Sequence, residues 1–184
     1  GLIKDIKKIQ NHKFKKIDSQ ILLVGKTFGH LGQSVLLEEI YSLNEGLPPE
    51  VNLSNEKNNG ETIIKLINKN LVNSVHDISS GGIILSLAEM ALSSLIGVKL
   101  IKPKKLSNIF EYFFGEDQGR YLVEIDKSNY AKVEKILKDN NIYYENIGFT
   151  QKDFFELDNE LKIKVKELYD INNKWYKSYY GINS

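Results

Sequence analysis

The order of the apolar segments constrains the fold of this chain more than any other feature. Short apolar runs bounded by turn residues, typical of buried strands, alternate with longer segments whose apolar residues recur every three or four positions, as on one face of a helix. The sequence predicts strands at 21–24, 73–78, 97–101, 120–125, 142–150, 154–157 and 161–165. It predicts helices at 34–41, 83–95, 106–114, 130–137 and 167–180. A further helix should begin at Asn52 or Ser54, and its apolar stripe should consist of Ile63, Ile64, Ile67 and Leu71.

Strand–helix–strand units are followed by short antiparallel returns in the second half. This order indicates an α+β fold, layered α/β/α, with a mixed and largely antiparallel sheet and a partly ferredoxin-like second half. No repeat or linker interrupts the 184 residues, so we expect one domain, 1–184. A chain of this length buries about 70% of the surface that its unfolded form exposes, which is enough for a core without disulfides.

Composition excludes several classes of protein. Hydrophobic residues make up 41% and charged residues 27% with a net charge of +1, which argues against disorder. The absence of cysteine excludes disulfides and thiolate zinc sites, and it fits a reducing, cytoplasmic setting. No apolar run approaches about 18 residues, so we expect no membrane partner. The start at Gly1 has no signal-peptide layout and no Met, so we interpret the chain as a fragment, a processed product or a tag remnant.

The basic residues are not arranged as in a nucleic-acid binder. Lys and Arg together number 25, but Arg120 is the sole Arg, and 24 acidic residues are interleaved with the lysines. Nucleic-acid binding usually needs a strong positive excess on one face. We therefore expect no nucleic-acid partner and a solvated surface of mixed charge.

The first of three glycine-containing stretches runs from Gly25 to Ser34, between a predicted strand and a predicted helix. Backbone N–H groups at such a place can meet an anion, which makes Gly32, Gln33 and Ser34 binding candidates. The stretch lacks the Gly-Lys-Ser/Thr end of a P-loop. The competing interpretation is a tight turn in which Ser34 caps the helix.

The second stretch places polar residues and a glycine pair where a strand gives way to an apolar helix. Glycine permits close approach of a ligand to the backbone, and a helix start favours negative charge. The neighbours His76 and Asp77 should point to opposite faces of a strand, so they do not form one metal site without a bend. The competing interpretation is a histidine bonded to the backbone in a packed turn. The binding candidates here are His76, Asp77, Ser79, Gly81 and Gly82.

The third stretch, residues 114–120, holds two carboxylates, an amide and the sole Arg between a helix and a strand. Arg forms two parallel bonds to phosphate or carboxylate that Lys does not reproduce. The candidates are Glu116, Asp117, Gln118 and Arg120. A structural clamp by Arg120 that fixes the turn is an equally weighted interpretation.

Other sequence patterns assign no catalytic residue and no metal ligand. The patterns G-x-S-x-G and H-E-x-x-H and an EF-hand loop are absent, and three histidines are too few to predict a His-rich metal site. Aromatic residues gather near the end of the chain, which favours core or interface packing over stacking on bases. They are Tyr169, Trp175, Tyr176, Tyr179 and Tyr180.

Four blocks occur in the order expected for one family: 31–34 (LGQS), 48–57 (PPEVNLSNEK), 75–82 (VHDISSGG) with 88–91 (AEMA), and 114–120 (FGEDQGR). Through them nearly the whole chain resembles the AIR-synthase-related C-terminal domain family, in the form found in the large subunit of phosphoribosylformylglycinamidine synthase. The family usually has Asp where this chain has Ser80, which removes one carboxylate. The usual Asp before the second helix is Asn52, which also caps well.

The resemblance implies a fold like the C-terminal domain of AIR synthase and a role in purine biosynthesis. Enzymes of that kind convert formylglycinamide ribonucleotide to the amidine with ATP, Mg²⁺ and glutamine-derived ammonia. It implies that ATP and Mg²⁺ are bound mainly by other domains of the same large subunit, and that a glutaminase subunit or domain and a small bridging subunit are partners. The chain would then be one wall of a cleft and, by itself, not catalytic.

Two other functions remain open from the residues. One is a domain of a sister enzyme such as AIR synthase. The other is a stand-alone module that binds a small regulatory ligand, as ferredoxin-like domains do, an analogy that rests on fold alone.

Overall fold

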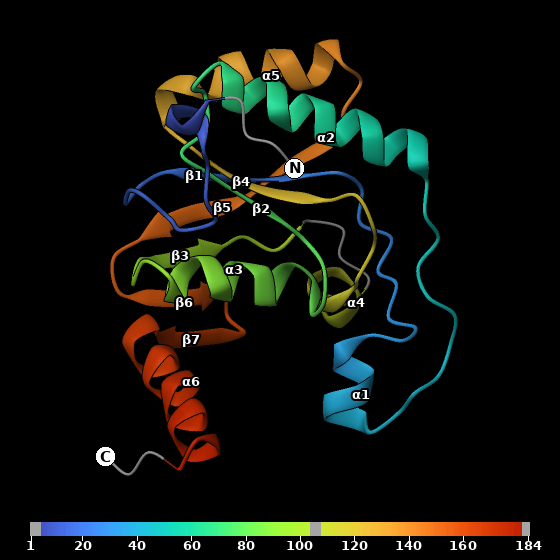
Figure 1. Ribbon diagram of the computed structural model, residues 1–184, viewed down its shortest axis with the longest axis vertical. Coiled ribbons are helices and arrows are strands. Elements are labelled where there is room, and N and C mark those ends of the chain that lie inside the picture. Colours follow the sequence, from blue (N-terminus) through green and yellow to red (C-terminus); the bar gives the residue numbers. More distant parts are fainter. Residues whose placement is uncertain (1–4, 104–107, 182–184) are drawn as a thin grey trace.

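The fold is described by a computed structural model over residues 5–103 and 108–181. Seven strands form one sheet in the order β2-β4-β1-β5-β3-β6-β7 (Figure 1). The strands are β1 (Gln20–Val24), β2 (Ser74–Asp77), β3 (Gly97–Leu100), β4 (Tyr121–Ile125), β5 (Tyr144–Gln151), β6 (Phe154–Leu157) and β7 (Leu161–Lys164). The helices are α1 (Val35–Tyr41), α2 (Leu53–Asn68), α3 (Gly82–Leu92), α4 (Ile109–Phe114), α5 (Tyr130–Asp139) and α6 (Val165–Tyr179), with 3₁₀ turns at Ile6–Lys8 and Lys127–Asn129.

Most neighbouring strands in the sheet are antiparallel. Of the pairs formed by the described strands, only β3 and β6 run parallel. Because β1 lies antiparallel between β4 and β5, the unit β4–α5–β5 is a split β-α-β arrangement, as in ferredoxin-like folds. The expected α+β fold with a mixed, largely antiparallel sheet is confirmed.

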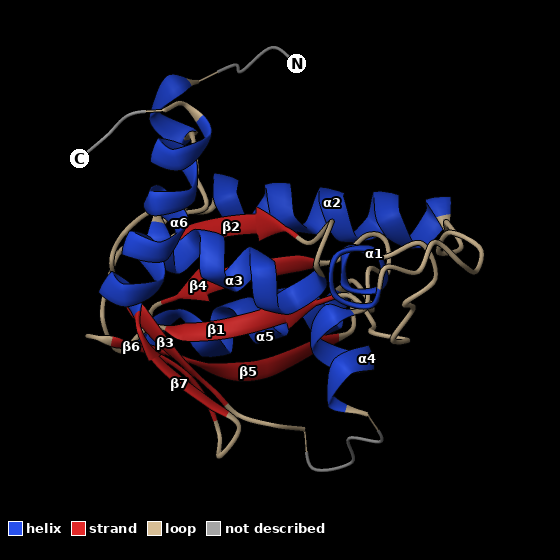
Figure 2. Ribbon diagram, turned by 90° about the horizontal axis from the view of Figure 1, so that it is seen from below, coloured by secondary structure: helices blue, strands red, loops and turns tan. Residues whose placement is uncertain are grey.

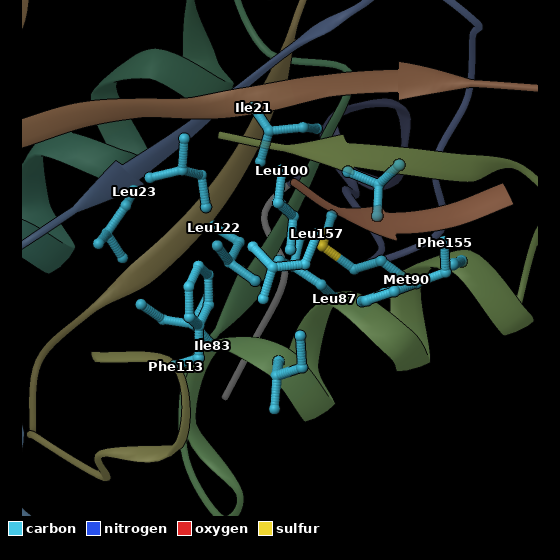
Figure 3. Close-up of a cluster of buried hydrophobic side chains, with 14 of the residues drawn as sticks. Ile21, Leu23, Ile83, Leu87, Met90, Leu100, Phe113, Leu122, Phe155 and Leu157 are labelled. Carbon is cyan, nitrogen blue, oxygen red and sulfur yellow. The ribbon is translucent and has the colours of Figure 1, made fainter. Parts of the chain in front are cut away.

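Successive side chains of β1 point to opposite faces of the sheet, and a separate hydrophobic core lies on each face. Ile21 and Leu23 point to one face of the sheet, where α3 and α4 pack. Leu22 and Val24 point to the other face, against α2 and α5. Figure 1 shows the two helix pairs on opposite sides of the sheet, and Figure 3 shows Leu87 and other α3 side chains against the strands. The predicted layering is therefore present.

Polar side chains cap the N-termini of α1 and α2. The Ser34 hydroxyl accepts the N–H of Leu37, and the Asn52 side chain accepts the N–H of Asn55 at 2.9 Å. Asn141, with a φ of 54°, provides the predicted left-handed exit after α5. In Figure 2, α1, α4 and the start of α2 all lie toward the same end of the strands, while Figure 1 shows α2 on the opposite side of the sheet from α4.

Two details of the predicted helices are wrong. Ile64 is 58% exposed, and Leu66 takes its place in the core beside Ile63, because α2 lies on the sheet at a slightly different rotation. Helix α3 ends at Leu92, three residues before the predicted end. The predicted helix at 106–114 is confirmed from Ile109, while residues 104–107 lie outside the described part of the chain.

The aromatic residues of α6 do not belong to the core. Trp175 is 65% exposed and Tyr179 is 71% exposed, and their rings stack on each other rather than on the sheet. Only the first turn of the helix is anchored, through Val165. The core alternative for this cluster is therefore wrong, while the interface alternative stays a prediction. Within the described residues, no helix combines the length and the apolar character needed to cross a membrane.

Candidate functional site

The three glycine-containing stretches meet at one carboxylate. Oxygen Oε1 of Glu116 accepts the backbone N–H of Val35 and that of Gly81, both at 2.8 Å. Val35 is the first residue of α1, and Gly81 is the N-cap of α3. A carboxylate there satisfies two N–H groups that helix geometry leaves open. The chain therefore supplies its own anion at both helix starts.

A second carboxylate fixes the loop that follows β1. Asp117 is 5% exposed, and its Oδ2 accepts the N–H groups of Phe28 and Gly29 at 2.9 and 3.0 Å. Its Oδ1 accepts the N–H of His30 at 3.3 Å. Asp117 thus takes up three N–H groups of the stretch in which the sequence suggested a bound anion, although not those of the named candidates Gly32, Gln33 and Ser34.

Arg120 is a buried clamp that holds the turn of the third stretch. Its Nε donates to the carbonyl oxygen of Asp117, its Nη2 to that of Gly115 and its Nη1 to the hydroxyl of Thr27. The side chain is fully buried, and Nη1 lies 3.7 Å from the Asp117 carboxylate. Burial lowers the pKa of the guanidinium, and the nearby Asp117 opposes this shift. These contacts are those of the structural clamp, one of the two interpretations left open by the sequence.

The glycine pair approaches protein backbone. A Cβ atom at Gly82 would lie 2.6 Å from the carbonyl oxygen of Gly115 and 2.8 Å from that of Phe113. Both glycines have positive φ, 76° at Gly81 and 67° at Gly82. The pair is therefore needed to seat α3 against the end of α4.

His76 is bonded to carboxylates, which differs from the expected bond to the backbone. Its Nε2 lies 2.7 Å from Oε2 of Glu89 on α3, and its Nδ1 lies 3.4 Å from Asp77. Because the strand ends at Asp77, the carboxylate of Asp77 lies close to the ring of His76 and not on the opposite face of the strand. The ring of His12 lies 5.2 Å from that of His76. This group is separate from the cleft described next.

An open cleft of about 920 Å³ lies beside the fixed loop. Of the twelve predicted binding residues, Asp117 and Gln118 line it. Gly32 and Gln33 instead hold the chain after α1. The backbone N–H of Gln33 donates to the carbonyl oxygen of Glu45, and Gly32 packs on the backbone of Leu47. The other predicted candidates contribute no surface to this cleft. They are Ser34, His76, Asp77, Ser79, Gly81, Gly82, Glu116 and Arg120.

Much of the cleft wall consists of amide side chains that the sequence did not single out as ligands. Asn52, Asn55 and Asn59 line it from the start of α2. Their spacing of three and four residues places them on one helix face, a signal that could have found them. Asn59 already donates to the carbonyl oxygen of Gly119 at 2.8 Å. The Gln118 side chain is exposed, with one 3.5 Å bond to the Glu116 carbonyl.

Tyr143 brings an aromatic ring to the same cleft. Its hydroxyl donates to Oε1 of Glu145 at 2.5 Å, while the hydroxyl of Tyr112 donates to Oε2 at 2.9 Å. The bond to Glu145, aided by burial, raises the pKa of Tyr143 to about 12. Nζ of Lys26 lies 5.9 Å from the centre of the Tyr143 ring.

The charge of the cleft is unfavourable for a bare phosphate. Among the residues that the structure describes, its acidic residues are Glu50, Glu56, Glu111 and Asp117, and its one Lys is Lys26. Across residues 5–103 and 108–181, no three His, Asp or Glu side chains are grouped so as to hold a metal ion. The wall thus offers amides and carboxylates, and a phosphate placed here needs cations from elsewhere.

Comparison with known proteins identifies relatives over nearly the whole chain. A family model described as "AIR synthase related protein, C-terminal domain" matches residues 16–156. The subunit PurL of phosphoribosylformylglycinamidine synthase from Pelagibacter ubique is 43% identical over 179 residues. That from Rhodopseudomonas palustris (strain HaA2) is 38% identical over the same length. Each match covers 97% of this chain but 24% of the relative, so the chain spans about a quarter of these proteins.

Solved structures share the fold at low identity. T. maritima PurL complexed with FGAR has a TM-score of 0.71 at 14% identity, covering 89% of this chain and 30% of that one. The hydrogenase maturation protein HypE in complex with ATP has a TM-score of 0.60 at 12% identity, covering 88% of this chain and 54% of the other. At these identities the likeness concerns the fold alone.

Proposed function

We propose that this chain, which belongs to the AIR synthase related protein, C-terminal domain family, is the C-terminal domain of a phosphoribosylformylglycinamidine synthase large subunit. In this role its 184 residues act as one domain of an ATP-dependent carbon–nitrogen ligase of purine biosynthesis. The enzyme would convert formylglycinamide ribonucleotide and glutamine-derived ammonia to the amidine. The observation that carries the proposal is the 43% identity to a PurL subunit over 97% of this chain.

The cleft supports a role as one wall of a larger site. It is open and polar, and the loop on its rim is fixed by Asp117 rather than left mobile. Exposed Gln118 and Asn55 are available to a ligand that carries amide, hydroxyl or ribose groups. Glu116 and Arg120 act behind the wall, by holding its backbone in place.

The residues of the cleft do not fit ATP with Mg²⁺ by themselves. Glu116 and Asp117 already accept the backbone N–H groups that could cradle a phosphate, and within the described part of the chain Lys26 is the one Lys or Arg on the wall. ATP and Mg²⁺ would therefore be held mainly by other domains of the large subunit. A glutaminase subunit or domain and a small bridging subunit would complete a cytoplasmic enzyme.

The test uses the complete polypeptide that contains this chain. We expect ATP-dependent ADP release that requires formylglycinamide ribonucleotide and ammonia. Gln118→Ala and Asn55→Ala should raise KM for one of the substrates about tenfold, since each removes an exposed amide that faces the cleft and can bond to a ligand. Asn68→Ala, an exposed change at the far end of α2, is the matched control and should leave KM unchanged.

If the complete polypeptide instead forms aminoimidazole ribonucleotide, the chain is a domain of the sister enzyme, AIR synthase. Tight binding of a small effector by a protein with no ligase activity would assign the regulatory module. Either outcome overturns the proposal.

A further inference from the structure

The charges of the chain are unevenly distributed along the sequence. Residues 27–56 contain five glutamates and no Lys or Arg, whereas all 25 basic residues and the other 19 acidic ones lie outside this segment. The segment comprises the cleft loop, α1, the connection to α2 and the first residues of α2. We call it the acidic arm. Its glutamates are Glu38, Glu39, Glu45, Glu50 and Glu56.

The acidic arm also carries apolar side chains that are exposed to solvent. Leu47 is 79% exposed and Ile40 is 69% exposed, and of the α1 residues only Leu36 is buried. In Figure 1, α1 stands away from the sheet, and the connection to α2 runs along the outside of the molecule. The exposed large apolar residues are Phe28, Ile40, Tyr41, Leu43, Leu47, Val51 and Leu53.

This exposure does not come from a loose segment. The carbonyl oxygen of Leu47 lies 2.7 Å from Nε2 of His30, and Gln33 bonds to Glu45 and Gly46 through its backbone and side-chain N–H groups. Glu116 holds the start of α1 through the N–H of Val35. The backbone of the arm is thus fixed while its apolar side chains face solvent, which is the preorganisation that docking surfaces use.

We propose that the acidic arm is a docking surface for a basic face on another domain of the same polypeptide. Apolar side chains surrounded by carboxylates match an apolar patch surrounded by Lys and Arg, and the glutamates disfavour any acidic partner. The inference rests on the proposed function, since the relatives contain about four times the length of this chain. A covalently linked domain covers such a patch at high effective concentration, which keeps it from aggregating.

The position of the arm connects docking with the cleft. Leu31, Pro49 and Glu50 belong to the arm and also line the cleft. A basic domain seated on the arm therefore lies at the cleft rim. It brings further cations there for a phosphate-bearing ligand.

The test is zero-length carbodiimide coupling in the complete polypeptide, read by mass spectrometry. We expect Glu38, Glu39 or Glu45 to couple to lysines of another domain. In an equimolar mixture of ¹⁴N- and ¹⁵N-labelled protein, each coupled pair should carry a single isotope. Coupled pairs of mixed isotope would show that a second copy occupies the arm, and this would overturn the proposal. The proposal would equally be overturned if the glutamates couple to a separate subunit, couple to lysines of this chain, or do not couple at all.

A charge-reversed variant gives an independent readout. Glu38→Lys/Glu39→Lys/Glu45→Lys should speed hydrogen exchange of the amides at 42–53 at least tenfold. The matched control, Glu61→Lys/Asp139→Lys/Asp153→Lys, changes three exposed acids elsewhere and should leave that exchange unchanged. Unchanged exchange in the first variant would contradict docking. Ligase activity of the wild-type polypeptide, measured separately, tests the proposed function, so the two failures are distinguishable.

Discussion

Nη2 of Arg120 lies 2.6 Å from the carbonyl oxygen of Gly115 and so closes the turn that brings the three glycine-containing stretches together. The same guanidinium reaches Asp117 and Thr27, and no part of it is exposed. The planar fork of Arg carries donors on three separate nitrogen atoms, so it reaches three acceptors that the single nitrogen of an ammonium does not span. This geometry explains an arginine in a chain that otherwise uses lysine.

Arg120→Lys should destabilise the protein by about 3 kcal/mol, because at least two of the three bonds are lost and each is worth about 1.5 kcal/mol or more when buried. The measurement is the midpoint of urea unfolding, with the slope compared to detect changes in the denatured state. Lys26→Ala, on the exposed side of the cleft, is the control and should shift the midpoint little. An unchanged midpoint for Arg120→Lys would contradict the clamp.

Asp117→Asn should loosen the cleft loop. The carboxamide keeps the size of the side chain but places an NH₂ group opposite N–H donors, so the bonds to Phe28 and Gly29 or the bond to His30 are lost. We expect a loss of about 2 kcal/mol in stability and faster hydrogen exchange at residues 28–30. The neighbouring change Gln118→Ala should alter neither quantity, and equal effects of the two variants would argue against a specific role for Asp117.

Gly82→Ala should be among the most damaging single changes in the chain. The new Cβ would meet two carbonyl oxygens at 2.6 and 2.8 Å, and Ala is strained at a φ of 67°. We expect a loss of more than about 2 kcal/mol, measured by thermal or urea unfolding. Gly60→Ala is the matched control in a regular helix, where the added methyl meets only the Tyr121 hydroxyl. If both variants unfold at the same midpoint, the close approach of α3 to α4 is not required.

Tyr143 should titrate at a pH of about 12 in the folded protein because its hydroxyl donates to Glu145. The ordinary phenol value is about 10, so the neutral form is favoured by folding. This contribution to stability is present below about pH 10 and is lost as the pH rises through about 12. NMR of ¹³C-labelled tyrosine follows the titration directly.

Glu145→Gln should move the pKa of Tyr143 back toward its ordinary value, because the negative acceptor is removed. Glu160→Gln removes a carboxylate that pairs with Lys102 and should leave the Tyr143 titration in place. Identical titrations in wild type and Glu145→Gln would show that the hydrogen bond is not the cause of the shift.

The local elements could be read from the sequence because their signals are short-range. The run of apolar residues at Ile21–Val24, the caps Ser34 and Asn52, and the left-handed Asn141 each depend on neighbours within a few positions. The rotation of α2 could not be read in the same way. Ile64 and Leu66 are both apolar, and only packing against the sheet places one outside and the other inside.

The sequence by itself determined the order of strands and helices, the family and the three stretches that meet near one turn. Tertiary structure decided what the polar groups with partners far away in the sequence contact. Glu116 accepts the N–H of Val35, which lies 81 positions earlier in the chain, and that of Gly81, which lies 35 positions earlier. The amides of α2 likewise line the same cleft as Tyr143. The physical reason is that a carboxylate has the same chemistry whether it holds a ligand or the backbone. Which of these it binds depends on the donors that the folded chain brings to it.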